Sequence, residues 1–192
     1  MYIHDVRQRF GSMRRLCERA LAQVTDEEFL GGAPATSANP IGVLVKHISG
    51  YQLSRWTDFL DTDGETTGRD REAEFRLQGE TREELMRQWD AGWASVLQAL
   101  ENLTHADLAR TVTIRGEPHS VPAAINRSLV EAAYHIGQIV QQARGLRGAD
   151  WSFLSIPPGG TDAHNRDMRR RFPDMGSGAE PEDRDGTRQV TV

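Results

Sequence analysis

The chain has 192 residues, of which 38% are hydrophobic and 27% charged, with a formal net charge of −5. That length allows one domain with a hydrophobic core and an added tail. No apolar run approaches the ~20 residues that span a bilayer, so no membrane span is expected. Acidic and basic residues alternate without the basic face that nucleic-acid binders show, so nucleic acid is not expected as a partner.

The N-terminal residues and the cysteine content indicate where the protein works. The first fifteen residues contain no apolar segment of the kind found in secretory signals. Cys17 is the only cysteine, so no internal disulfide can form. Both features favour a cytoplasmic protein.

The first helix is predicted from about His4 to Val24, where apolar residues recur at spacings of three and four. Cys17 belongs to this apolar stripe. We therefore interpret it as a small buried hydrophobic residue and not as a nucleophile.

A second helix is predicted from Pro40 to about Asp61, with Asn39 as its N-cap and Pro40 in its first turn. The polar connection that follows, residues 61–75, is long for a tight helical hairpin. A connection of this length either crosses the molecule or borders a site.

The third helix begins at a capping box formed by Thr81 and Glu84 and runs to about Leu103. Alternating residues around Gly116, in the stretch TVTIRGEPHSV, predict a short β-hairpin. The fourth helix is expected from about Pro122 to Leu146.

Four helices of similar length with little strand predict an all-α fold, a four-helix bundle. The apolar segment WSFLSIPPGG, residues 151–160, is expected to pack back on this bundle. From residue 166 the chain is charged and rich in glycine, which predicts a flexible tail. The expected organisation is thus one domain over residues 1–165 and a tail over 166–192.

Three ionisable residues on the predicted helices are the candidate site. Glu131 and His135 are four residues apart and share one side of the fourth helix. His47 lies at the edge of the apolar face of the second helix. Two ligands from one helix and a third from a neighbour would form a metal site with open positions. The alternatives are a surface ion pair between Glu131 and His135, and a core position for His47.

Four stretches in order, NPIGVLVKHISG, RWTDFLDTDGE, YHIGQIV and LSIPPGG, resemble the DinB/YfiT-like superfamily. The resemblance extends from the first helix to about Asn165 and is closest to a branch known only as a domain of unknown function. It implies a four-helix bundle with a crossed connection, and a homodimer.

The resemblance also implies a divalent metal held by three histidines, at the positions of His47, His135 and the residue four before it. Here that residue is Glu131. A carboxylate is a competent ligand, so the expected site is His47, Glu131 and His135, for zinc, nickel, manganese or iron. Glutamate lowers the charge of the centre and shifts its preference toward manganese or iron.

The implied function is a metal-dependent enzyme that acts on a small-molecule substrate. Relatives transfer low-molecular-weight thiols such as bacillithiol and mycothiol, and a metal-dependent hydrolase follows the same logic, because a metal activates either a thiol or water. The alternative is a non-catalytic dimeric bundle that binds a small molecule or a protein.

Overall fold

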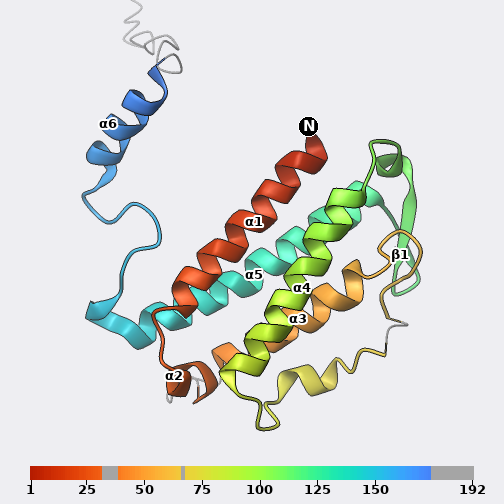
Figure 1. Ribbon diagram of the computed structural model, residues 1–192, viewed down its shortest axis with the longest axis horizontal. Helices are drawn as coiled ribbons and strands as arrows, with labels where there is room; N and C mark the ends of the chain where they lie inside the picture. The colour runs from red at the N-terminus through yellow and green to blue at the C-terminus, as the bar shows by residue number, and fades with distance from the viewer. Residues whose placement is uncertain (32–38, 66–67, 174–192) are drawn as a thin grey trace, which may run out of the picture. The chain divides into compact units, whose positions relative to one another are not determined.

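The computed structural model describes residues 1–31, 39–65 and 68–173 (Figure 1). Within these ranges the protein is mostly helical, with six α-helices and one two-stranded antiparallel sheet. None of the helices described is both long and apolar enough to cross a membrane. The elements are α1 (Tyr2–Leu21), α2 (Asp26–Gly31), α3 (Ile41–Trp56), α4 (Arg82–Asn102), β1 (Thr111–Ile114), β2 (Glu117–Ser120), α5 (Val121–Arg147) and α6 (Thr161–Arg171), with 3₁₀ turns η1 (Glu72–Phe75), η2 (Ala106–Ala109) and η3 (Gly148–Asp150).

The chain divides into two compact units, Met1–Ser152 and Phe153–Val192. The second unit contains α6, which crosses the predicted boundary between residues 165 and 166. Of the tail predicted over 166–192, residues 166–171 are therefore helical and 174–192 lie outside the described residues. Ser152 is hydrogen-bonded to Gln23 at both its backbone N–H and its carbonyl, at 2.8 and 3.0 Å. Packing of the rest of the segment on the first unit stays a prediction.

The four long helices of the first unit pack against one another. α3 contacts α4 and α5, while α1 contacts α5 and α4 (Figure 1). Aromatic rings fill the space between them: Phe10 meets Trp56 and Trp93 edge to face, with ring centroids 5.6 and 6.3 Å apart. These rings are almost fully removed from water, and each such burial contributes several kcal/mol, about 25 cal/mol per Å².

The helix ends follow the predictions in part. Thr81 and Glu84 form the expected capping box at the start of α4. The prediction of Asn39 as the cap of α3 is wrong, because Pro40 occupies that position and no side chain caps the helix. α3 also ends at Trp56 and not at Asp61. The backbone turns extended at Thr57, and Asp58 adopts a left-handed conformation with φ 49°, which an α-helix cannot continue.

The hairpin and the fourth predicted helix, α5, are confirmed. β1 pairs with β2 from Thr111↔Ser120 to Ile114↔Glu117. Arg115 and Gly116 between them both have positive φ, as a two-residue hairpin turn requires. The chain then enters α5 directly, since the Ser120 hydroxyl accepts a hydrogen bond from the Ala123 amide. The hairpin thus fixes where α5 begins.

The connection between α3 and α4 runs back along α3, because its turn η1 packs against that helix (Figure 1). The short helical elements were not expected: they are α2, η1, η2 and η3, and the longer α6 was not expected either. α2 begins with Thr25 and Glu28 exchanging backbone-to-side-chain hydrogen bonds of 2.7 and 3.2 Å. This is the capping pattern that also begins α4.

Candidate metal centre

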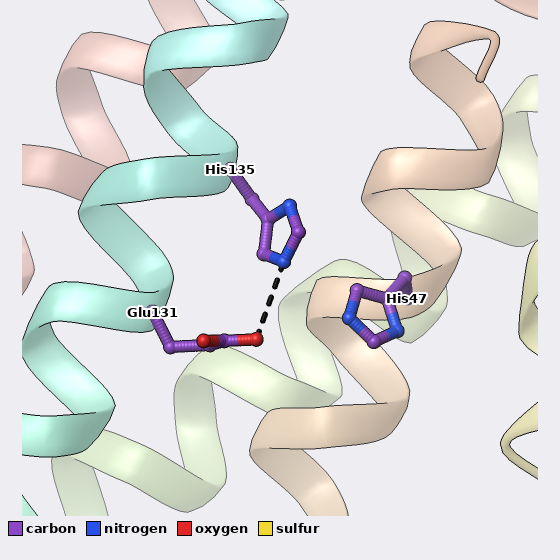
Figure 2. A group of neighbouring side chains, drawn as sticks. All are labelled: His47, Glu131 and His135. Carbon is purple, nitrogen blue, oxygen red and sulfur yellow. Dashed lines mark hydrogen bonds and ion pairs between the residues drawn. The ribbon is translucent and has the colours of Figure 1, made fainter. Parts of the chain in front are cut away.

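The three candidate ligands meet between α3 and α5. His47 projects from α3, and Glu131 and His135 project from α5 toward it (Figure 2). One potential ligand atom from each lies within 4.8 Å of the others, a spacing at which the group could hold a metal ion. His47 is buried, while Glu131 and His135 are half-buried. The structure therefore brings together all three residues that the sequence singled out.

Helix packing explains this convergence. In α5 the residues next to the pair, Ala132, Ile136 and Ile139, are buried in the core. Glu131 and His135 lie one turn apart at the edge of that buried face, where α5 approaches α3. The apolar stripe fixes the rotation of α5 and so directs both side chains toward His47.

A carboxylate holds the ring of His47 from the other side. Nδ1 of His47 lies 2.8 Å from Oε2 of Glu74, which belongs to η1. Arg69 donates two hydrogen bonds to the same carboxylate, at 2.6 and 2.7 Å. An ionised carboxylate only accepts hydrogen bonds, so Nδ1 of His47 carries a proton, and in the neutral ring Nε2 keeps its lone pair. This is the arrangement found behind metal-binding histidines.

The charge of Glu74 is maintained in spite of its burial. Burial opposes ionisation most strongly, but the hydrogen bonds from Arg69 and His47 outweigh it and hold the pKa of Glu74 below its ordinary value. Burial likewise disfavours the charge of Arg69, yet Glu74 raises the pKa of that guanidinium above its ordinary value. Both groups remain charged at neutral pH as a buried pair.

His135 presents an unusual contact. Its Nδ1 lies 2.8 Å from Oε1 of Gln138, so in this orientation of the amide a protonated Nδ1 donates to Gln138. In the neutral form of this tautomer Nε2 is an acceptor 3.3 Å from Oε1 of Glu131, whereas a doubly protonated ring donates a hydrogen bond to that oxygen (Figure 2). Two acceptors at this distance repel each other unless a cation lies beside them or a second proton is bound. This donor set fits a divalent metal.

The sequence alone did not indicate the roles of Glu74, Arg69 and Gln138. Glu74 and Arg69 lie in the polar connection, which has no periodicity to place them. Two signals were nevertheless present: a buried histidine needs a partner for its second ring nitrogen, and the long connection was expected either to cross the molecule or to border a site.

A surface cavity elsewhere in the first unit is separate from this group. A surface cavity of about 690 Å³ is formed by residues 53–61 and by α4, and it includes none of the three candidates. Within the described parts of the chain, His47, Glu131 and His135 are the one group of three or more such residues close enough to share an ion. Cys17 is buried away from solvent, and burial raises the pKa of its thiol, as expected for a core residue.

The family model described as "Protein of unknown function (DUF1572)" matches residues 1–160. The chain belongs to the DUF1572 family. No curated protein matches it. The DUF1572 match covers the whole of the first compact unit, and with it all three candidate ligands, and it ends one residue before α6.

In this DUF1572 protein the three residues offer two imidazole nitrogens and a carboxylate. Three protein ligands leave at least one coordination position free for water or substrate, as catalytic metal sites require. Glu131 and His135 are half-buried, so a metal held by this group would lie close to solvent.

Proposed function

We propose that this protein is a DinB/YfiT-like four-helix bundle with a crossed connection that binds a divalent metal through His47, Glu131 and His135. The supporting observation is that His47 on α3 and Glu131 and His135 on α5 each offer a ligand atom within 4.8 Å of the others. With His135 neutral, these three side chains would hold a divalent cation through two imidazole nitrogens and a carboxylate oxygen, and the cation would offset the repulsion between the Nε2 lone pair and the Glu131 carboxylate.

The proposed activity is that of a metal-dependent enzyme, either a transferase of low-molecular-weight thiols or a hydrolase. A bound divalent metal supplies a Lewis acid that lowers the pKa of a thiol or of water at the open position. His47, Glu131 and His135 hold the site, and Glu74 and Gln138 fix the orientation of the two rings. The buried Cys17 thiol does not supply the nucleophile, so a thiol must arrive with a cosubstrate.

The ligand set favours particular metals. Glutamate in place of a third histidine reduces the net charge of the centre by one and adds a hard oxygen ligand. Manganese and iron are therefore better suited to this site than to a site formed by three histidines, while zinc and nickel can still bind.

Metal content tests this proposal directly. Untagged protein is purified and analysed by elemental mass spectrometry beside His47→Ala, Glu131→Ala and His135→Ala. The expected result is near-stoichiometric metal in the parent, lost from each variant. Parent protein that stays empty after incubation with zinc, manganese, iron and nickel contradicts the proposal.

The alternative is a non-catalytic dimeric bundle. The contact between His135 and Glu131 is also compatible with it. If His135 carries a second proton, it forms an ordinary ion pair with Glu131 one turn away. Val130 and Tyr134 on α5 are 68% and 62% exposed, which suits a face covered by a second copy of the chain. Light scattering after gel filtration tests for the homodimer, which has twice the 21.5 kDa of the chain, and metal content separates this alternative from the enzyme.

A further inference from the structure

We propose that Glu74 is a positioning residue for the metal centre, held by Arg69 and given room by Gly50, and that it fixes the tautomer and orientation of His47. This inference rests on the proposed metal site. It concerns residues other than the three ligands. Glu74 and Arg69 lie in the connection between α3 and α4, and Gly50 lies in α3.

The first step is the hydrogen bond between the ring and the carboxylate. Glu74 Oε2 is 2.8 Å from His47 Nδ1, and both side chains are nearly inaccessible, 7% and 5% exposed. The carboxylate accepts the Nδ1 proton, so a neutral ring presents an unprotonated Nε2. An imidazole hydrogen-bonded to a carboxylate is also a stronger base and a better ligand.

The second step is how the carboxylate itself is held. Arg69 contacts Oε1 at 2.6 Å through Nε and Oε2 at 2.7 Å through an Nη, a two-point contact that allows little rotation. Arg69 is itself only 7% exposed and lies over the ring of Tyr51, 5.7 Å from its centroid. Removing either charge leaves the other buried and unpaired, so the pair is fixed in place.

The third step is the space that Gly50 leaves for the side chain of Glu74. Gly50 lies inside α3, one turn after His47, where glycine costs about 1 kcal/mol relative to alanine. A Cβ at this position would lie 2.8 Å from Cδ of Glu74 and closer still to its Oε1. Because Gly50 has no side chain, the carboxylate of Glu74 can approach His47.

The segment around Glu74 completes the enclosure of His47. The ring of Phe75 lies 4.7 Å from that of His47, centroid to centroid, and the Arg71 guanidinium lies 4.8 Å over the Phe75 ring. η1 thus covers one side of His47 with an apolar ring and supplies a charged acceptor at Nδ1. The opposite nitrogen faces Glu131 and His135.

The decisive experiment compares Gly50→Ala with Gly145→Ala. Both are helical glycines, but a Cβ at Gly145 meets nothing within 4 Å. Zn²⁺ affinity is measured by competition with a chromophoric chelator. Gly50→Ala is expected to lose about 10- to 100-fold in affinity, as loss of an outer hydrogen-bond partner does, while Gly145→Ala matches the parent.

A purely structural role for Gly50 predicts a different result. Alanine favours the helix, so a variant that only altered α3 would keep the parent's Zn²⁺ affinity whatever its unfolding temperature. Equal affinities in the parent and in Gly50→Ala overturn the proposal. Glu74→Gln is measured in parallel and is expected to show a similar loss.

A second measurement needs no metal. Long-range ¹H–¹⁵N correlation spectra of the metal-free parent, recorded where the imidazole is neutral, report which nitrogen of His47 carries the proton. Nδ1 is expected, with the preference lost in Glu74→Gln because an amide donates as well as accepts. Protonation at Nε2 overturns the proposal. A parent that binds no Zn²⁺ overturns the proposed function instead, and the tautomer then still decides whether Glu74 orients the ring.

Discussion

At the scale of single residues, the candidate site shows what spacing predicts and what it cannot. Glu131 and His135 were found because helical periodicity places residues four apart on one side. His47 was found because it lies at the edge of an apolar stripe. Glu74 was not found, because its partner His47 is 27 residues away in the sequence and the connection between them has no periodicity. Gly50 carried a signal, since glycine inside an apolar helical stretch often marks a close approach.

In the proposed metal site, the residue at position 131 is expected to influence the choice of metal. Glu131→His replaces the hard carboxylate with a third imidazole, so the ratio of Zn²⁺ to Mn²⁺ affinity is expected to rise by on the order of tenfold. Competition titrations with the two metals measure the ratio. Glu131→Gln is the control and is expected to weaken both metals. An unchanged ratio in Glu131→His contradicts a role for this side chain as a ligand.

The single thiol offers a simple check of the core. Cys17 is 0% exposed, and burial, followed by the neighbouring charge of Glu18, raises the pKa of its thiol. Native protein is therefore expected not to react with a thiol-specific chromogenic disulfide over minutes, while protein in denaturant reacts with one equivalent. Rapid reaction of the native protein would show that α1 does not pack as described.

At the scale of elements, local chemistry predicted helix starts better than helix ends. The capping box of α4 and the hairpin turn at Arg115 and Gly116 are short signals with one favoured geometry. α3 ends five residues early because Asp58 is left-handed, and nothing in the sequence around it demanded that conformation. The start of α2 carried the same Thr-to-Glu signal as α4, at Thr25 and Glu28, so it was predictable.

The end of the connection that carries Glu74 is tied to α3 by Lys46, which donates to the Arg76 carbonyl at 2.9 Å and to Glu80. Burial opposes ionisation of Glu80, but Lys46 and nearby backbone amides hold its pKa below the ordinary value. A lowered folded-state pKa adds stability above the unfolded-state pKa, and this stability is lost as the pH falls through the folded-state value.

Glu80→Gln is therefore expected to reduce the free energy of unfolding at neutral pH by up to about 1 kcal/mol. The difference from the parent is expected to shrink as the solution is acidified through the lowered pKa of Glu80. Urea denaturation of both proteins across a series of acidic pH values measures it. A difference that stays constant at every pH would show that the charge of Glu80 has no part in stability.

At the scale of the whole molecule, apolar spacing and turn residues correctly predicted a mostly helical protein with one short hairpin. Periodicity correctly placed four long amphipathic segments that contact one another through their apolar faces. The division after Ser152 and the helix α6 were not predicted. α6 buries no residue, so it lacks the apolar stripe from which helices are recognised.

Because the candidate ligands come from two helices far apart in sequence, metal binding is expected to stabilise the fold. At a free metal concentration 100-fold above Kd the gain is about 2.7 kcal/mol, which raises the unfolding temperature of a domain of this size by roughly 5–10 °C. Calorimetry with and without Zn²⁺ measures the rise. His135→Ala, the control, is expected to show none, and an equal rise in both proteins would place binding elsewhere.

The most direct test of the central claim is an anomalous difference map from crystals grown with Zn²⁺, recorded on either side of the zinc absorption edge. The expected result is one strong peak bonded to His47, Glu131 and His135, with Glu74 on the opposite nitrogen of His47. A map without a peak at this group, from crystals whose protein is otherwise folded as described, would contradict the assignment of these residues as metal ligands.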